Sequence, residues 1–88
     1  MTTSMKTITV RYFASIREAM GTGSATLQTA AATVGALREE LMAQSDAAAT
    51  ALTHGKAVRM ALNQAMCDGD AEIRSGDEVA FFPPVTGG

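Results

Sequence analysis

The sequence contains very little of what usually reinforces a protein of this size. Among its 88 residues there is one cysteine, Cys67, and one histidine, His54. Cys67 therefore has no partner for a disulfide within the chain, and a single histidine cannot anchor a zinc site with several ligands. So short a chain has room for one hydrophobic core. We expect a single domain that is stabilised by packing, with no bound metal.

Charge and hydropathy exclude two further classes of protein. Seven basic residues stand against nine acidic ones, a formal net charge of −2, so the basic excess that nucleic-acid binding requires is missing. No apolar run approaches the ~20 residues that cross a bilayer. The five residues before Lys6 have neither the charge nor the apolar stretch of a secretory leader. We expect a protein of the reduced cytoplasm that binds neither nucleic acid nor membranes.

The first half of the chain shows the hydrophobic alternation of a strand and then the hydrophobic period of a helix. Residues 6–13 alternate between apolar and polar side chains, which predicts a half-buried strand, and the turn sequence that ends at Ser24 leads into a short return strand at 25–28. Thr33 is a favourable N-cap for an amphipathic helix over residues 34–44. The inner face of the first strand is predicted to comprise Ile8, Val10 and Tyr12.

The second half returns from helix to strand. Ser45-Asp46 can cap an alanine-rich helix that runs to about Thr53 and stops at His54-Gly55. Residues 58–63 alternate and predict a third strand. A brief irregular or strand-like link, Glu72-Ile73-Arg74, lies between two turns. The last strand is predicted from Glu78 to Phe82, because Pro83-Pro84 has no N–H groups for a sheet.

This order of elements is typical of the β-grasp arrangement. A helix crosses a hairpin and packs on a mixed sheet of four or five strands, which places the protein in the α+β class, with one main helix and a second short one. We predict a β-grasp domain over residues 1–82, followed by an extended tail over residues 83–88.

Conventional catalytic motifs are incomplete in this sequence. Gly21-Thr22-Gly23 would need a glycine at position 26 to form a dinucleotide fingerprint, and Thr26 stands there. The acidic residues of 68–78 lack the spacing of a calcium loop. His54 has no acidic partner at catalytic spacing, and Cys67 has no neighbouring base that would lower its pKa. We interpret these residues as structural.

The end of the chain is its most distinctive segment. Residues 83–88 carry no charged side chain, two prolines stiffen their base, and Gly87-Gly88 lack the Cβ atoms that would block entry into a confined active site. Six extended residues reach ~20 Å. Adenylation by ATP would turn the terminal carboxylate into a mixed anhydride that a sulfur or amine nucleophile attacks. The alternative interpretation is an ordinary frayed terminus.

Strand parity predicts two exposed phenylalanines near the root of this tail. Phe13 has the parity of the outward residues of the first strand, and Phe82 has that of Glu78 and Ala80, whereas Phe81 faces inward. Exposed aromatic side chains beside a reactive tail indicate a docking surface. The alternative is that a helix covers this face or that a bulge resets the register.

The closing residues, 76–88, resemble the C-terminus of the molybdopterin synthase small subunits, a family of sulfur-carrier proteins. Residues 11–18, the helix start at 33–41 and Asn63-Gln64 resemble further segments of the same family. The resemblance spans nearly the whole chain and implies a ubiquitin-like β-grasp fold. Specificity is highest in the last thirteen residues.

The resemblance implies that Gly88 is the reacting residue. An ATP-dependent adenylyltransferase related to ubiquitin-activating enzymes would adenylate it, and a sulfurtransferase system would convert it to a thiocarboxylate. The loaded tail would enter a pocket of the large subunit, where two rounds of sulfur transfer turn cyclic pyranopterin monophosphate into the dithiolene of molybdopterin. The chain would then be a non-catalytic sulfur donor, with the catalytic groups on the large subunit.

The same resemblance implies a heterotetramer with two copies of each subunit, in which the small subunit binds no cofactor and the activating enzyme uses ATP. It also assigns residues to the contact between the subunits. The tail residues that thread the partner's active site are Pro83, Pro84, Val85, Thr86 and Gly87. The residues assigned to the partner-facing surface are Phe13, Arg17, Met66 and Phe82.

Other functions are compatible with a terminal Gly-Gly. One is a sulfur carrier for thiamin or cysteine synthesis, although thiamin carriers are usually shorter and lack the Phe-Phe-Pro-Pro approach of residues 81–84. A second is a ubiquitin-like modifier that forms isopeptide bonds. A third is a plain interaction module with a disordered tail.

Overall fold

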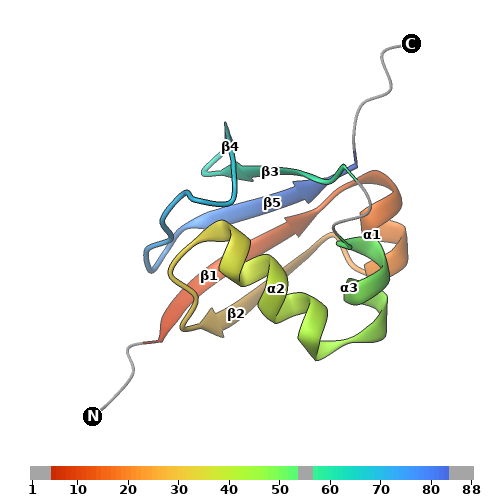
Figure 1. Ribbon diagram of the computed structural model, residues 1–88, viewed down its shortest axis with the longest axis horizontal. Helices are drawn as coiled ribbons and strands as arrows, with labels where there is room; N and C mark the ends of the chain where they lie inside the picture. The colour runs from red at the N-terminus through yellow and green to blue at the C-terminus, as the bar shows by residue number, and fades with distance from the viewer. Residues whose placement is uncertain (1–4, 54–56, 84–88) are drawn as a thin grey trace.

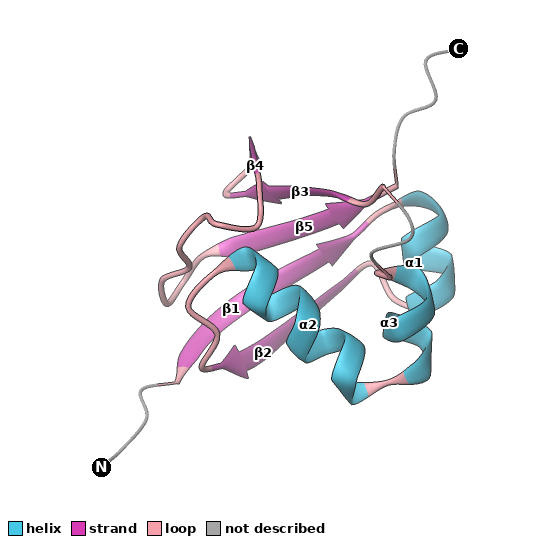
Figure 2. Cartoon of the chain, in the orientation of Figure 1, coloured by secondary structure: helices cyan, strands magenta, loops and turns pink. Residues whose placement is uncertain are grey.

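The computed structural model describes residues 5–53 and 57–83. This part of the chain forms a sheet with helices packed against it (Figure 2). The elements are, in chain order, β1 (Lys6–Tyr12), α1 (Ala14–Met20), β2 (Ser24–Thr29), α2 (Val34–Gln44), α3 (Asp46–Ala51), β3 (Arg59–Leu62), β4 (Ala65–Cys67) and β5 (Glu78–Phe82).

The sheet is mixed and has five strands in the order β2-β1-β5-β3-β4. Its two central neighbours, β1 and β5, are parallel, and the other neighbouring pairs are antiparallel. Figure 1 shows α2 crossing one face of this sheet, with α1 and α3 near the end where β5 terminates. This is the β-grasp topology, and it confirms the predicted α+β class and mixed sheet.

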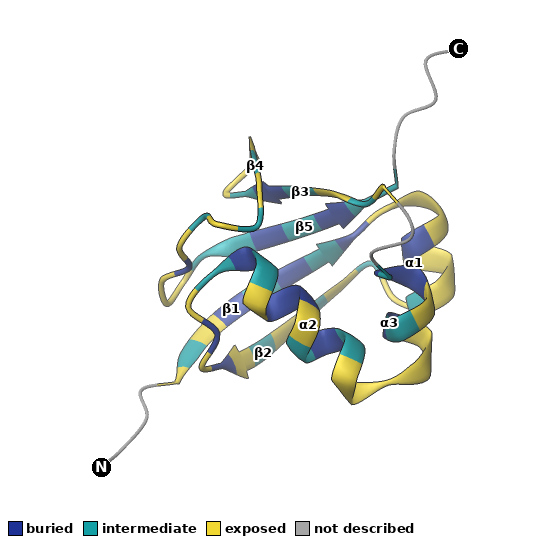
Figure 3. Cartoon of the chain, viewed as in Figure 1, coloured by how far each residue is buried: buried dark blue, intermediate teal, exposed yellow. Residues whose placement is uncertain are grey.

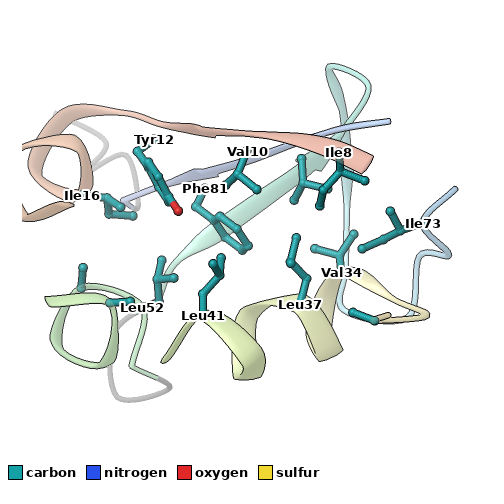
Figure 4. Close-up of a cluster of buried hydrophobic side chains, with 14 residues drawn as sticks. Ile8, Val10, Tyr12, Ile16, Val34, Leu37, Leu41, Leu52, Ile73 and Phe81 are labelled. Atoms are coloured by element: carbon teal, nitrogen blue, oxygen red, sulfur yellow. The ribbon is translucent and has the colours of Figure 1, made fainter. Parts of the chain in front are cut away.

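The hydrophobic core lies between the sheet and the helices, as Figure 4 shows. The predicted inner faces of the first and last strands are confirmed, because their alternate residues are buried. Phe81 has no exposed surface, and its ring stacks with that of Tyr12 at a centroid distance of 6.4 Å. The sheet contributes Ile8, Val10, Tyr12, Val79 and Phe81 to the core, and the helical side contributes Val34, Leu37, Leu41 and Leu52.

Both predicted helix caps are confirmed. The Oγ1 of Thr33 accepts a hydrogen bond from the N–H of Ala36 at 3.1 Å, and the Oγ of Ser45 accepts one from the N–H of Ala48 at 3.1 Å. Each cap satisfies an amide that has no partner within its own helix. The alanine-rich helix ends at Ala51, two residues before the predicted end, and the predicted stop at residues 54 and 55 lies outside the described residues.

Helix α1 was not predicted, and it stands where the sequence suggested a simple hairpin connection. Its seven residues bury one side chain, Ile16, which is too little for a hydrophobic period to be visible. The helix ends at Gly21, whose φ of 77° is left-handed and whose N–H donates to the oxygen of Arg17 at 3.0 Å. Gly21 was the sequence feature that could have indicated this helix, because glycine commonly ends helices in this conformation.

Strand β4 was also missed, because three residues are too few to show an alternation. It forms because Asn63 and Gln64 adopt positive φ angles of 51° and 69°, which reverse the chain after β3 in a two-residue turn. The side-chain amide of Asn63 then donates to Asp77 at 3.0 Å and accepts from the N–H of Glu78 at 2.9 Å. Hydrogen bonds from Asn63 and from the N–H of Arg74 hold the pKa of Asp77 below its usual value.

The two ends of the predicted third strand were wrong by one residue each. β3 covers Arg59–Leu62, so that residue 58 precedes it and Asn63 belongs to the turn. The predicted link at residues 72–74 makes an isolated bridge from Glu72 to Thr33 and buries Ile73. Among the residues that the structure describes, no helix has the length and apolar character needed to cross a membrane.

Replacing Arg38 with methionine is expected to destabilise the fold by ~2–3 kcal/mol. Arg38 is only 7% exposed, and its guanidinium donates to the carbonyl oxygens of Leu52 at 2.7 Å and Thr53 at 3.0 Å. Methionine would leave both carbonyls without these donors. Urea unfolding measures the loss, and Arg74→Met, at an exposed arginine, serves as the control. Equal stability of the two variants would contradict this role for Arg38.

Candidate functional site

The end of β5 lies beside the beginning of α1. The N–H of Phe13 donates to the carbonyl oxygen of Phe81 at 3.2 Å, which ties the two segments together. β5 ends at Phe82, as predicted, and Pro83 is the last described residue. The predicted boundary between domain and tail stays a prediction. The other tail positions of the sequence analysis lie outside the described residues, and they are Pro84, Val85, Thr86, Gly87 and Gly88.

Phe13 and Phe82 form an aromatic pair at this end of the sheet. Their ring centroids are 6.1 Å apart and their planes meet at 87°, the edge-to-face geometry that aromatic rings favour. Phe13 is 41% exposed and Phe82 is partly exposed. The predicted strand parity is therefore confirmed, although Phe82 is shielded in part because Phe13 packs against it.

The pair adjoins an open face of the sheet, opposite to the face that carries the buried core. The register places Arg11, Ala80, Ala61 and Met66 in one row across four strands. Ala80 is partly exposed, Ala61 beside it is buried, and Met66 at the edge of the sheet is 56% exposed. Figure 3 shows β5 alternating between buried and intermediate residues, and the edge strand β4 as largely exposed. We call Phe13, Phe82, Ala80 and Met66 the open-face patch.

Arg11 connects the patch to the middle of the sheet. Its Nη1 lies 3.4 Å from the Oε2 of Glu78 on the neighbouring strand, and its guanidinium carbon lies 5.5 Å from the centre of the Phe13 ring. A cation over the face of an aromatic ring is attracted by the negative charge density there. Arg11 therefore contributes to the orientation of the exposed ring.

Arg17 lies in the last turn of α1, near the same aromatic pair. With Arg11 and Phe13 it lines a cleft of about 320 Å³ that the loop between α1 and β2 closes on one side. A Cβ on Gly23 would lie 3.2 Å from the Nε of Arg17. The absence of a side chain at Gly23 thus leaves room for the guanidinium of Arg17 against the loop.

A smaller apolar cavity of about 90 Å³ opens beside Pro83. Ile16 and Ala19 of α1, Ala51 of α3 and Val58 provide most of its wall. These residues come from three separate parts of the chain, so the helices and the end of the sheet together shape the surface from which the last segment departs.

Residues 5–53 and 57–83 provide no cluster of metal-binding side chains. This part of the chain contains no group of three or more histidine, cysteine, aspartate or glutamate side chains that could hold a metal ion. Burial and the negative charge of Asp68 raise the pKa of the Cys67 thiol, so that it is protonated at neutral pH. Cys67 is therefore a poor nucleophile, in agreement with its structural interpretation.

The structure brings together some of the residues that the sequence analysis selected. Phe13 and Phe82 are in contact, Arg17 shares a cleft with Phe13, and Met66 lies on the same open face but on the outermost strand. Sequence reasoning missed Arg11 and Glu78 as part of this site. The sequence showed that both residues lie on the outward faces of their strands, but their contact depends on β1 and β5 being neighbours.

The fold and this surface define a class of protein: a small β-grasp domain that presents an exposed aromatic face at the root of its C-terminal segment. The chain belongs to the ThiS family, whose model matches residues 10–88. It is 48% identical over 81 residues to the molybdopterin synthase sulfur carrier subunit of Escherichia coli strain K12, covering 92% of this chain and 99% of that protein.

The solved structures that are similar to the whole domain include the following two. One is the complex of subunits 1 and 2 of the molybdopterin-converting factor from Helicobacter pylori, with 26% identity, a TM-score of 0.62, and coverage of 97% of this chain and 100% of that chain. The other is SAMP1 from Haloferax volcanii, with 25% identity, a TM-score of 0.72, and coverage of 93% and 99%.

Proposed function

We propose that this protein is the sulfur-carrier subunit of a molybdopterin synthase. The observation that carries the proposal is the combination of the aromatic open-face patch, at the end of the strand that leads into the last six residues, with 48% identity to a carrier of that name.

The chemistry is proposed to occur at the Gly88 carboxyl group. Attack of its carboxylate on ATP releases pyrophosphate and forms an acyl adenylate, and hydrosulfide supplied by the sulfurtransferase then displaces AMP to leave a thiocarboxylate. Cyclic pyranopterin monophosphate is the proposed acceptor, and it receives two sulfur atoms from two loaded tails. The adenylyltransferase supplies the ATP site, so the carrier itself needs no bound cofactor.

The proposed partners are three proteins of the cytoplasm: the adenylyltransferase, a sulfurtransferase, and the large subunit of the synthase. The Helicobacter pylori complex supports the last of these, because it joins subunit 1 to subunit 2 of a molybdopterin-converting factor. We propose that the large subunit contacts Phe13, Arg17, Met66 and Phe82 and receives the residues from Pro83 to Gly88.

Mass spectrometry tests the proposal directly. The full chain is incubated with its cognate adenylyltransferase, ATP and a sulfur source, and we expect its mass to rise by about 16 Da as one oxygen is replaced by sulfur. The same mixture without ATP is the control and should leave the mass unchanged. The absence of the heavier species in a mixture that loads another carrier would refute the proposal.

A second candidate function is that of a protein modifier, and the similarity to SAMP1, which a second solved structure names a small archaeal modifier protein, favours it. An amine nucleophile would then displace AMP and form an amide with a lysine side chain. Immunoblots of cells that express the tagged chain separate the two functions. A modifier gives a ladder of conjugates that depends on Gly88, whereas a dedicated carrier gives only the free protein.

A further inference from the structure

The cleft between Arg11 and Arg17 concentrates positive charge in a chain whose net charge is −2. Its wall also includes Thr22 and Ser24, and the Oγ1 of Thr22 donates to the carbonyl oxygen of Ser24 at 2.9 Å. Phe13 forms the boundary between this cleft and the open-face patch. A polar, basic cleft is thus continuous with an apolar contact surface.

The guanidinium of Arg17 provides N–H donors in this cleft. Within the described part of the chain no carboxylate lies at ion-pair distance from it. Its guanidinium is exposed and lies against the loop at Gly23. The planar fork of an arginine matches the two oxygens of a carboxylate, which makes a carboxylate its most favourable protein ligand.

Arg11 is already near a carboxylate, but it is not saturated. Glu78 contacts one nitrogen, Nη1, at 3.4 Å, which is a long distance for a charge-assisted hydrogen bond. A guanidinium has five N–H donors, and the Arg11 side chain is 44% exposed. The charges of Arg11, Arg17 and Glu78 leave the cleft with a net positive charge, which a further carboxylate would balance.

We propose that an acidic side chain of the large subunit, the protein proposed to receive the tail, binds in this cleft between Arg11 and Arg17, beside the Phe13 ring. This inference rests on the proposed function, because it deepens the description of the docking surface. It assigns a role to Arg11 and Glu78, and it states the chemistry of the partner residue that faces Arg17.

A carboxylate on a protein suits this cleft better than a free anion from solution. The cleft is open to solvent. A small anion bound there would lose part of its hydration shell and gain few contacts with the protein. A carboxylate carried by a partner that already contacts Phe13 and Phe82 is held at high effective concentration beside the guanidinium groups. Opposite charges at the edge of an apolar contact also speed association and select the partner.

Glu78 makes the proposal testable in two directions. If Glu78 competes with the partner's carboxylate for Arg11, replacing it with glutamine should strengthen binding. If Arg11 serves only to orient Phe13, then loss of Glu78, which anchors Arg11, should weaken binding or leave it unchanged. The two roles therefore predict different results for the same substitution: tighter binding if Glu78 competes, and weaker or unchanged binding if it only anchors Arg11.

The experiment measures association and dissociation rates between the full-length chain and the large subunit of molybdopterin synthase from the same organism, at low and at high NaCl concentration. We expect Arg17→Gln and Arg11→Gln each to raise Kd roughly tenfold at low salt, mainly through slower association. Glu78→Gln should lower Kd by about threefold. The control Arg74→Gln, an exposed arginine outside the cleft, should stay within about twofold.

High salt should weaken the wild-type complex and reduce the difference between the wild-type chain and the arginine variants. Thermal unfolding of each variant shows whether its fold is intact. Wild-type affinity of both arginine variants, or binding by Glu78→Gln that is weaker than or equal to that of the wild-type chain, would overturn the proposal while leaving sulfur loading of Gly88, and hence the proposed function, in place. If the chain neither gains sulfur nor binds the large subunit, both this proposal and the proposed function are refuted.

Inorganic phosphate serves as the probe for a free anion. Amide chemical shifts of the carrier alone are recorded during a phosphate titration, and we expect the loop at Thr22 and Ser24 to remain unchanged. Saturable shifts there, together with partner binding that is indifferent to Arg17→Gln, would show a small-anion site and would refute the carboxylate proposal.

Discussion

Deletion of Gly88 is expected to abolish molybdopterin formation while leaving the fold intact. The reacting carboxyl group would then belong to Gly87 and would lie one residue, up to ~3.6 Å of extended chain, short of its position in the partner's active site. An offset of that size removes the alignment on which the transfer depends. Gly88 is the terminal residue and has no side chain to pack, so the unfolding curve should not move.

Molybdoenzyme activity in a strain that carries only the deletion variant measures this effect, and loss of the mass gain in the loading reaction measures it in vitro. Deletion of Thr2, a single residue near the opposite terminus, is the matched control and should retain activity. Normal molybdoenzyme activity without Gly88 would refute the assignment of the reacting residue.

Phe81→Ala is expected to cost ~3–5 kcal/mol of stability, the usual range for removing a buried phenylalanine. Phe81 is fully buried, stacks with Tyr12, and faces α2 from the centre of the sheet. A small domain has a total stability of about 5–15 kcal/mol, so this single change should lower its melting temperature strongly. Denaturant unfolding gives the value.

Phe82→Ala, at the neighbouring residue, is expected to weaken partner binding while changing stability little. It should weaken binding of the large subunit by about 2 kcal/mol, roughly 30-fold in Kd, because Phe82 and Phe13 form the exposed aromatic pair. Its stability should change by less than ~1 kcal/mol. A large fall in melting temperature with unchanged binding would show that Phe82 is a packing residue. The two variants are each other's control.

This contrast between adjacent phenylalanines was predictable from the sequence. Side chains of a strand alternate between its faces, so Val79 and Phe81 had to face one way and Ala80 and Phe82 the other. The structure confirms that order. The caps at Thr33 and Ser45 were equally local, since each depends on a side chain that reaches an amide three residues ahead.

The elements that sequence reasoning missed were short. α1 buries a single side chain, and β4 has three residues, so neither offers a period to detect. Their formation depends on neighbours: α1 packs against α3 and β5, and β4 pairs with β3 after the turn at Asn63 and Gln64. Tertiary contacts therefore stabilise elements for which local patterns give little support.

By itself, the sequence determined the inner and outer residues of the main strands, the main helix and its cap, the lack of a complete catalytic motif, and the chemistry that a terminal glycine can perform. Each depends on residues within about one helical turn or one strand. The tertiary structure alone decided that β1 and β5 are parallel neighbours, and this brings Arg11 to Glu78 across 67 positions of the chain. Such pairing follows from the packing of the whole core. The basic cleft also became visible only in the folded protein, because α1, which sequence reasoning missed, places Arg17 in the same cleft as Arg11 and Phe13.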